Sequence, residues 1–184
     1  GAKPLPGCPG ETITEGLDGL RERLKEYYEL GARFAKWRAV IDIDARRPSA
    51  GSVKANAHAL ARYAAMCQEE NIVPIVEPEV LMDLDHDIDR CFEVTEYVLK
   101  MTFQALYEMR VQLEGIVLKP NMVIAGRKAK VQAGVEEAFV VEADGQLREG
   151  PGGGTEHRLG ALRDVELRLV AGAQDAAGLL LVER

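Results

Sequence analysis

The chain has 184 residues, of which 47% are hydrophobic and 29% charged, and its formal net charge at pH 7 is −7. This composition is typical of a globular protein with one core, and an acidic chain without a basic stripe is not expected to bind nucleic acid, because phosphate neutralisation supplies most of that affinity. No apolar stretch approaches the ~20 residues of a membrane-spanning helix and the three cysteines follow no zinc or disulfide spacing, so we expect a cytoplasmic protein without a membrane segment.

The first predicted element is a helix near the N-terminus. Apolar residues recur at helical spacing from Leu17 to Tyr28, and Thr12 with Glu15 matches a capping box before it. Gly31 follows the last of these apolar residues and predicts the end of the helix.

The elements that follow alternate strands with helices. They are a strand over 33–43, a helix over 49–70 capped by Ser49 or Ser52, a strand over 72–77, a helix over 87–109 and a strand over 115–119. The short, continuously apolar run of the second strand indicates burial on both faces, and the third strand is also predicted to be buried. Strands that alternate with long helices predict βαβ units and a parallel sheet.

Each predicted strand carries an ionisable residue at or near its end. These residues are Lys36, Glu77 and Lys119, and Pro78 and Pro120 follow the last two, where a missing N–H prevents extension of a central ladder. The spacings are 41 and 42 residues, one βα unit each, so we expect equivalent positions on neighbouring parallel strands. Two amines and a carboxylate then converge at the carboxyl end of one sheet, where α/β folds place their chemistry. The alternative is three ordinary solvated strand ends.

Two amines beside a carboxylate favour one kind of chemistry. A neighbouring positive charge and partial burial both disfavour the ammonium form of a lysine, and a neutral amine attacks carbonyl carbon to give a carbinolamine and then an imine. A carboxyl such as that of Glu77 supplies the proton that expels water, and the protonated imine accepts electrons when an adjacent C–C bond breaks. The residues therefore predict a Schiff-base lyase that needs no metal, with Lys119 or Lys36 as the nucleophile.

Several long blocks of the chain resemble one enzyme family. The blocks are Gly10-Glu-Thr-Ile-Thr-Glu-Gly-Leu-Asp-Gly-Leu20, Phe34-Ala-Lys-Trp-Arg38, Ile72-Val-Pro-Ile-Val-Glu-Pro-Glu79, Asp85-His-Asp87 and Glu114-Gly-Ile-Val-Leu-Lys-Pro-Asn-Met-Val123. They resemble class I fructose-bisphosphate aldolase, and the resemblance runs from about residue 5 to about residue 137. It implies an α/β fold of the TIM-barrel (β/α)8 type in a homo-oligomer, usually a tetramer. It also implies cleavage of the sugar phosphate fructose 1,6-bisphosphate into two triose phosphates, without a cofactor.

The resemblance also assigns roles to residues of this chain. It matches Lys119 to the imine-forming lysine, Glu77 to the carboxyl that acts as acid and base in imine formation, and Lys36 to the second active-site lysine. It matches Glu79 to the glutamate next to that carboxyl and Arg38 to a basic residue near the substrate phosphates. The resemblance thus chooses between Lys119 and Lys36, which the pattern of residues does not.

The resemblance covers only part of a barrel. A closed barrel needs eight βα units and ~250 residues, whereas three units are evident here, and residue 1 falls after the third strand of the family fold. From Ala138 onward the chain has no Lys, Cys, Ile, Met, Tyr, Asn or Ser, and the later phosphate loop, arginine and C-terminal tyrosine of the family have no match. We therefore predict a partial barrel over 1–137 and a divergent tail over 138–184. The tail is interpreted as a misread or spliced continuation or as an unrelated module.

A partial barrel leaves two functional alternatives open. The chain is either an aldolase-type aldehyde-lyase or a catalytically inactive aldolase fragment with only an assembly or binding role. An open three-stranded sheet exposes two edges, so we expect poor cooperativity in thermal unfolding, or oligomerisation. In the tail, residues 138–148 are predicted to form a hairpin around Asp144 and Gly145.

The remaining patterns do not predict a metal site. The aspartates at 83, 85, 87 and 89 begin like an EF-hand loop but lack its glycine and its last glutamate. His86 has no second histidine at a suitable spacing, while Cys67 and Cys91 lie at helical core spacing and are predicted to be packing residues.

Overall fold

The computed structural model describes residues 1–132 together with the short strands at 139–141 and 147–149. Its elements in chain order are β1 (Ala2–Pro4), β2 (Thr12–Thr14), α1 (Leu20–Glu29), β3 (Phe34–Ile41), α2 (Ala50–Glu69), β4 (Val73–Val80), α3 (Ile88–Glu108), the 3-10 turn η1 (Leu113–Gly115), β5 (Val117–Leu118), β6 (Phe139–Val141) and β7 (Leu147–Glu149). The predicted alternation of strands with helices is confirmed from β3 to β5.

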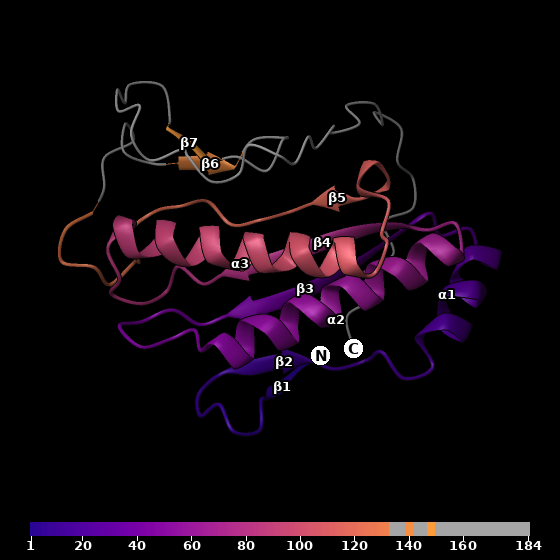
Figure 1. Cartoon of the computed structure of the whole chain (residues 1–184), viewed down its shortest axis with the longest axis horizontal. Coiled ribbons are helices and arrows are strands. Elements are labelled where there is room, and N and C mark those ends of the chain that lie inside the picture. Colours follow the sequence, from indigo (N-terminus) through magenta and orange to yellow (C-terminus); the bar gives the residue numbers. More distant parts are fainter. Residues whose placement is uncertain (133–138, 142–146, 150–184) are drawn as a thin grey trace.

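The central sheet is parallel and has the order β3-β4-β5. Helices α2 and α3 lie side by side and pack against one face of this sheet (Figure 1). Strand residues such as Trp37 and Val76 are buried there with helix residues such as Leu60 and Leu99. This shared apolar core holds the sheet and the helix layer together, since burial of apolar surface contributes roughly 25 cal/mol per Å². None of the helices in the part of the chain that the structure describes is long and apolar enough to cross a membrane.

The helix ends follow local signals in the sequence. The Ser49 hydroxyl accepts a hydrogen bond from the Ser52 backbone N–H at 3.1 Å, so Ser49 caps α2. The Asp87 carboxylate accepts one from the Arg90 N–H at 2.8 Å and caps α3, which gives a structural role to one member of the aspartate run. Gly31 follows Leu30, the C-cap of α1, and has a φ of 102°, a left-handed conformation that favours glycine.

The predicted capping box at Thr12 is wrong. Thr12 and Thr14 lie in β2, which pairs antiparallel with β1, and α1 begins only after Gly19. Their hydroxyls donate instead to the backbone carbonyls of Val40 and Arg38, at 3.3 and 2.6 Å, along the edge of β3 that β4 does not cover. A threonine hydroxyl satisfies either a helix end or a strand edge, and here a tertiary neighbour decides which.

The ends of β4 and β5 also differ from the prediction. β4 continues through Pro78 to residue 80, whereas β5 is only two residues long. Backbone nitrogens point alternately to the two sides of a strand. The Val73 N–H of β4 donates to the Arg33 carbonyl and thus points toward β3, so the nitrogen of Pro78 points toward β5. Because β5 has already ended at that level, the missing N–H of Pro78 interrupts no ladder.

In the tail, β6 and β7 form an antiparallel pair with Phe139 opposite Glu149. This pairing confirms the two strands of the predicted hairpin, while the predicted turn at Asp144 and Gly145 lies outside the described residues. The division of the chain into a partial barrel over 1–137 and a tail over 138–184 stays a prediction.

Candidate active site

The charged residues of β3 and β4 share one face of the sheet. Lys36 and Arg38 point away from the side on which Trp37 joins the helical core, because side chains alternate along a strand. The parallel register sets Arg38 beside Glu77, so Glu77 and Glu79 lie on the same face as these two cations. This face lies opposite the one that α2 and α3 cover.

Glu77 lies at the centre of a group that we call the amine cluster (Glu77, Lys36 and Lys119). The Lys119 amine donates to Oε1 of Glu77, and the Lys36 amine lies 3.4 Å from Oε2. The Glu77 side chain is 4% exposed, that of Lys36 20% and that of Lys119 59%. The structure thus brings together the two amines and the carboxylate that the sequence predicts to converge, with one amine largely enclosed and the other open to an approaching molecule.

The prediction that Lys36 and Lys119 both lie level with Glu77 on neighbouring strands is wrong for Lys36. In the register, Lys36 lies opposite Ile75, two residues before Glu77. Lys119 follows β5, where the register continues directly to Glu77. Lys36 still reaches the carboxylate because its four-carbon side chain spans one diagonal step across the sheet, roughly 7 Å. Spacing along the chain counts residues in loops and helices as well, so it does not fix register.

A second ion pair lies next to the amine cluster on the same face. The Arg38 guanidinium donates through Nε and Nη2 to one oxygen of Glu79. The Arg38 side chain is 43% exposed, and its remaining N–H groups leave donors for an anion such as a phosphate. Glu79 therefore fixes the orientation of a cation at the sheet surface.

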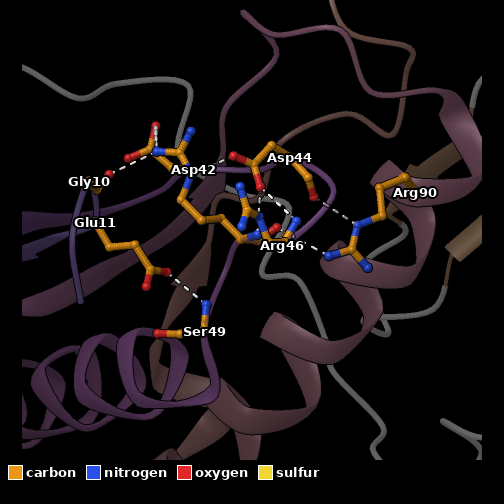
Figure 2. Close-up of polar contacts among 8 residues, drawn as sticks. Gly10, Glu11, Asp42, Asp44, Arg46, Ser49 and Arg90 are labelled. Carbon is orange, nitrogen blue, oxygen red and sulfur yellow. Dashed lines mark hydrogen bonds and ion pairs between the residues drawn. The ribbon is translucent and has the colours of Figure 1, made fainter. Parts of the chain in front are cut away.

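Another polar group, which the sequence analysis missed, holds the loop after β3. We call it the loop cluster (Asp44, Arg46, Arg47 and Arg90), and Figure 2 shows it with its neighbours. The Asp44 carboxylate accepts hydrogen bonds from the backbone N–H groups of Arg46 and Arg47, both at 2.7 Å, and from Nε of Arg47 at 2.8 Å. These backbone bonds first, and then the guanidinium, lower the pKa of Asp44 to about 2.

The loop cluster connects three parts of the chain. Arg90 of α3 donates to the carbonyls of Asp44 and Arg47, at 3.3 and 3.1 Å. Arg47 also donates to the Gly10 carbonyl, in the N-terminal segment, at 2.9 Å. Asp44 is a turn-favouring residue, because an aspartate carboxylate accepts backbone N–H groups shortly after it in the chain, but only the fold brings in Arg90 and Gly10.

The other residues singled out in the sequence take structural positions. His86 is 6% exposed in the loop before α3, and burial lowers its pKa although Asp85 and Asp87 act in the opposite direction. Cys67 and Cys91 are buried in the core, as predicted. Among the residues that the structure describes, no group of three His, Cys, Asp or Glu is placed to hold a metal ion.

Comparison with known sequences gives matches over most of the chain. The family model for glycolytic fructose-bisphosphate aldolase class I matches residues 1–143. A probable fructose-bisphosphate aldolase class 1 of Xanthomonas campestris pv. campestris is 65% identical over 137 residues, which are 74% of this chain and 41% of that protein. A fructose-bisphosphate aldolase of Dictyostelium discoideum is 56% identical over 139 residues, 74% of this chain and 39% of that protein. The chain spans about two fifths of the length of these curated relatives.

A comparison with solved structures agrees with the sequence matches. Fructose-bisphosphate aldolase from Plasmodium falciparum, in a complex with TRAP and a small-molecule inhibitor, has a TM-score of 0.72 and 49% identity to this chain. The match covers 74% of this chain and 40% of that chain. The predicted TIM-barrel class of α/β fold is therefore confirmed, with a partial set of strands in the described residues.

Proposed function

Since the chain belongs to the class I fructose-bisphosphate aldolase family, we propose that it is a Schiff-base aldehyde-lyase that cleaves fructose 1,6-bisphosphate to dihydroxyacetone phosphate and glyceraldehyde 3-phosphate. The proposal assigns this reaction to glycolysis in the cytoplasm and requires no metal or cofactor. The observation that carries it is the amine cluster, in which the buried Glu77 carboxylate contacts the Lys119 amine and lies 3.4 Å from that of Lys36.

Lys119 is the proposed nucleophile. Its neutral amine attacks the ketone carbon of the substrate, and as the N–C bond forms the C=O π bond breaks and the oxygen takes its electron pair. Transfer of a proton from the nitrogen to this oxygen gives a carbinolamine. The Glu77 carboxyl donates a proton to the carbinolamine hydroxyl, which leaves as water while the nitrogen electron pair forms the C=N bond of an iminium ion. The contact between Glu77 and Lys119 supports this step, because the proton donor already lies beside the nitrogen.

The iminium ion is the electron acceptor for C–C cleavage. A base removes the proton of the hydroxyl two carbons from the iminium carbon, the aldehyde leaves, and the electron pair of the broken bond gives an enamine. Glu77, which contacts Lys119, is the proposed base, because it is a carboxylate again after it has given its proton to the leaving water. Protonation of the enamine carbon and hydrolysis of the imine release the second product and restore the Lys119 amine.

The neighbouring charged residues support a phosphorylated substrate. Arg38 lies on the same face as the amine cluster, is partly exposed, and is oriented by Glu79. A guanidinium binds phosphate oxygens through several N–H groups at once, so we assign Arg38 and Glu79 to substrate binding. Lys36, whose amine lies 3.4 Å from Oε2 of Glu77, adds a second positive charge on this face, which favours an anionic ligand.

One observation favours a second candidate, a catalytically inactive aldolase fragment with an assembly or binding role. The described sheet has three strands, and the Lys119 side chain is 59% exposed rather than enclosed. An exposed site excludes water poorly, and exclusion of water is part of how such sites strengthen electrostatic interactions.

Trapping of the imine separates the two candidates. The chain is incubated with dihydroxyacetone phosphate and sodium borohydride, and the modified lysine is identified by peptide mass spectrometry. The aldolase proposal expects a reduced adduct at Lys119, loss of it in Lys119→Met, and an unchanged adduct in the matched control Lys128→Met, an exposed lysine outside the cluster. Absence of an adduct at Lys119 in the unaltered chain overturns the lyase proposal and favours the inactive fragment.

The oligomeric state is a separate part of the proposal. We expect a homo-oligomer, a tetramer by analogy with the family, because the charged face of the sheet and the free edge of β5 have no neighbouring element among the described residues. Sedimentation velocity over a range of concentrations tests this, and a monomer at all concentrations contradicts it.

A further inference from the structure

The segment that carries Lys119 is joined to the sheet by very little backbone structure. β5 has only two residues, and its pairing with β4 ends at Val76 and Leu118. One further backbone bond, from the Lys119 N–H to the Val76 carbonyl at 2.9 Å, closes the ladder. Pro78 then offers no N–H, so the ladder has no donor at the level directly after Glu77.

A side chain takes the place of the missing ladder. Oδ1 of Asn121 accepts the Val80 N–H at 3.0 Å, which is the next β4 donor on that side. Nδ2 of Asn121 donates to the Thr95 hydroxyl of α3 at 3.2 Å and to the Met122 carbonyl at 3.0 Å. Asn121 is 8% exposed and Thr95 1%, so these bonds are shielded from water.

We propose that Asn121, oriented by Thr95, is a positioning residue that holds Lys119 at the level of Glu77. The Lys119 and Asn121 bonds to β4, at Val76 and Val80, lie on either side of Glu77. The segment between them is therefore fixed at both ends, and the Lys119 side chain starts from a defined point beside the carboxylate. The effect on reaction rate rests on the proposed imine chemistry, whereas the effect on the position of Lys119 does not.

The alternative is that Asn121 and Thr95 only stabilise the fold. A buried amide that loses a partner destabilises any protein, whether or not it positions a reactive group. The test therefore needs a second buried threonine whose loss affects stability alone.

Thr102 provides that matched control. It lies on the same helix as Thr95, is also 1% exposed, and its hydroxyl donates to the Val98 carbonyl at 2.8 Å. Thr95→Val and Thr102→Val remove the same group from the same kind of surroundings, but only the first removes an acceptor from Asn121. Thr95→Ser keeps the hydroxyl and serves as the rescue variant.

Two readouts are measured on the full chain at a temperature where every variant is folded. The first is the rate of borohydride trapping of dihydroxyacetone phosphate at Lys119. The second is the rate of acetylation of Lys119 by acetic anhydride over a series of pH values, relative to Lys128 in the same sample. The second readout needs no imine chemistry, so it tests the position of Lys119 even when the unaltered chain gives no trapped adduct.

We expect Thr95→Val to lower the trapping rate about tenfold and to shift the pH profile of Lys119 acetylation, because small displacements of reacting groups have large effects on rate. Thr102→Val is expected to lower the melting temperature similarly while both readouts stay at the level of the unaltered chain, and Thr95→Ser to restore both. Equal changes in the two valine variants, or no change in Thr95→Val, overturn the proposal. If Thr95→Val changes the pH profile of Lys119 acetylation but not the trapping rate, the proposed effect of Asn121 on the reaction is overturned.

Discussion

Two carboxylates near the carboxyl ends of neighbouring strands have opposite surroundings. Asp44, in the loop cluster after β3, accepts two backbone hydrogen bonds and one from a guanidinium. Glu77, in the amine cluster of β4, is far more buried, yet its described partners are two lysine amines and no backbone N–H group. The more enclosed carboxylate is thus the one held by groups that can gain and lose protons.

The difference indicates which cluster can do chemistry. Backbone N–H groups cannot take up or release a proton near neutral pH, so they fix Asp44 as an anion, with a pKa of about 2. Glu77 has no backbone donor among its described partners and lies in contact with the amine of the proposed nucleophile, the position that an acid–base catalyst needs. We therefore interpret the loop cluster as structural and the amine cluster as reactive.

The largest effect is expected for Glu77→Gln. The amide keeps the size of the side chain but cannot donate the proton that expels water, so the trapping rate at Lys119 is expected to fall about 100-fold or more. The melting temperature is expected to change little, because the amide still accepts a hydrogen bond from Lys119. The control is Glu114→Gln, an exposed glutamate in η1. Trapping at the normal rate in Glu77→Gln contradicts the assignment of the reactive cluster.

A smaller effect, on stability alone, is expected for Asp44→Asn. The amide cannot form the charged bonds to Arg47, so the melting temperature at pH 7 is expected to fall by several degrees while the trapping rate stays the same. The control is Asp83→Asn, because the 3.4 Å pair of Asp83 with Arg127 is exposed and contributes little. A loss of trapping in folded Asp44→Asn shows that the loop cluster also serves the reaction.

The same variant has a defined pH dependence. The folded pKa of Asp44, about 2, lies below its ordinary value of 3.8, so the folded chain binds fewer protons than the unfolded chain in this window. The stability that Asp44 contributes is therefore complete above about pH 4 and lost as the pH falls toward 2. Melting curves of the unaltered chain and Asp44→Asn are expected to converge there, and a constant difference contradicts the cause given for the low pKa.

The smallest effect is expected for His86. Burial lowers its pKa below 6.5, so the unfolded chain takes up a proton before the folded chain does, and stability falls as the pH drops below 6.5. His86→Gln removes this titration, so the melting temperature of the variant is expected to depend less on pH below pH 6.5 than that of the unaltered chain. The matched control is His58→Gln on the exposed side of α2. Equal slopes in the unaltered chain and His86→Gln contradict the prediction.

The strands, the helices and part of the site could be predicted because their signals are local. Apolar spacing located β3, α2, β4 and α3 to within a few residues, and strand order followed from the alternation of strands and helices. The convergence of Lys36, Glu77 and Lys119 followed from one general property, that parallel strands end at the same edge of a sheet. The choice of Lys119 over Lys36 came from the resemblance of blocks of sequence, and its role in catalysis stays a prediction.

The wrong predictions share one cause. The sequence predicts a helix cap at Thr12, but its hydroxyl contacts a carbonyl 28 residues away at the edge of β3. The sequence predicts a strand end at Pro78, but the neighbouring strand ends earlier, so no ladder bond is lost. The spacing predicts Lys36 level with Glu77, whereas the register shifts it by two residues. In each case a residue type indicates what it can do, and the neighbour that it meets decides what it does.

The amino-acid sequence by itself determined the order of strands and helices along the chain and the convergence of Lys36, Glu77 and Lys119 at one edge of the sheet, because these depend on periodicity and on a rule common to parallel sheets. Only the tertiary structure decided the register that sets Arg38 beside Glu77, the loop cluster around Asp44, and the place of Asn121 as a substitute for ladder bonds. These features depend on contacts between segments that are distant in the chain, and such contacts form only when the helices and strands pack together.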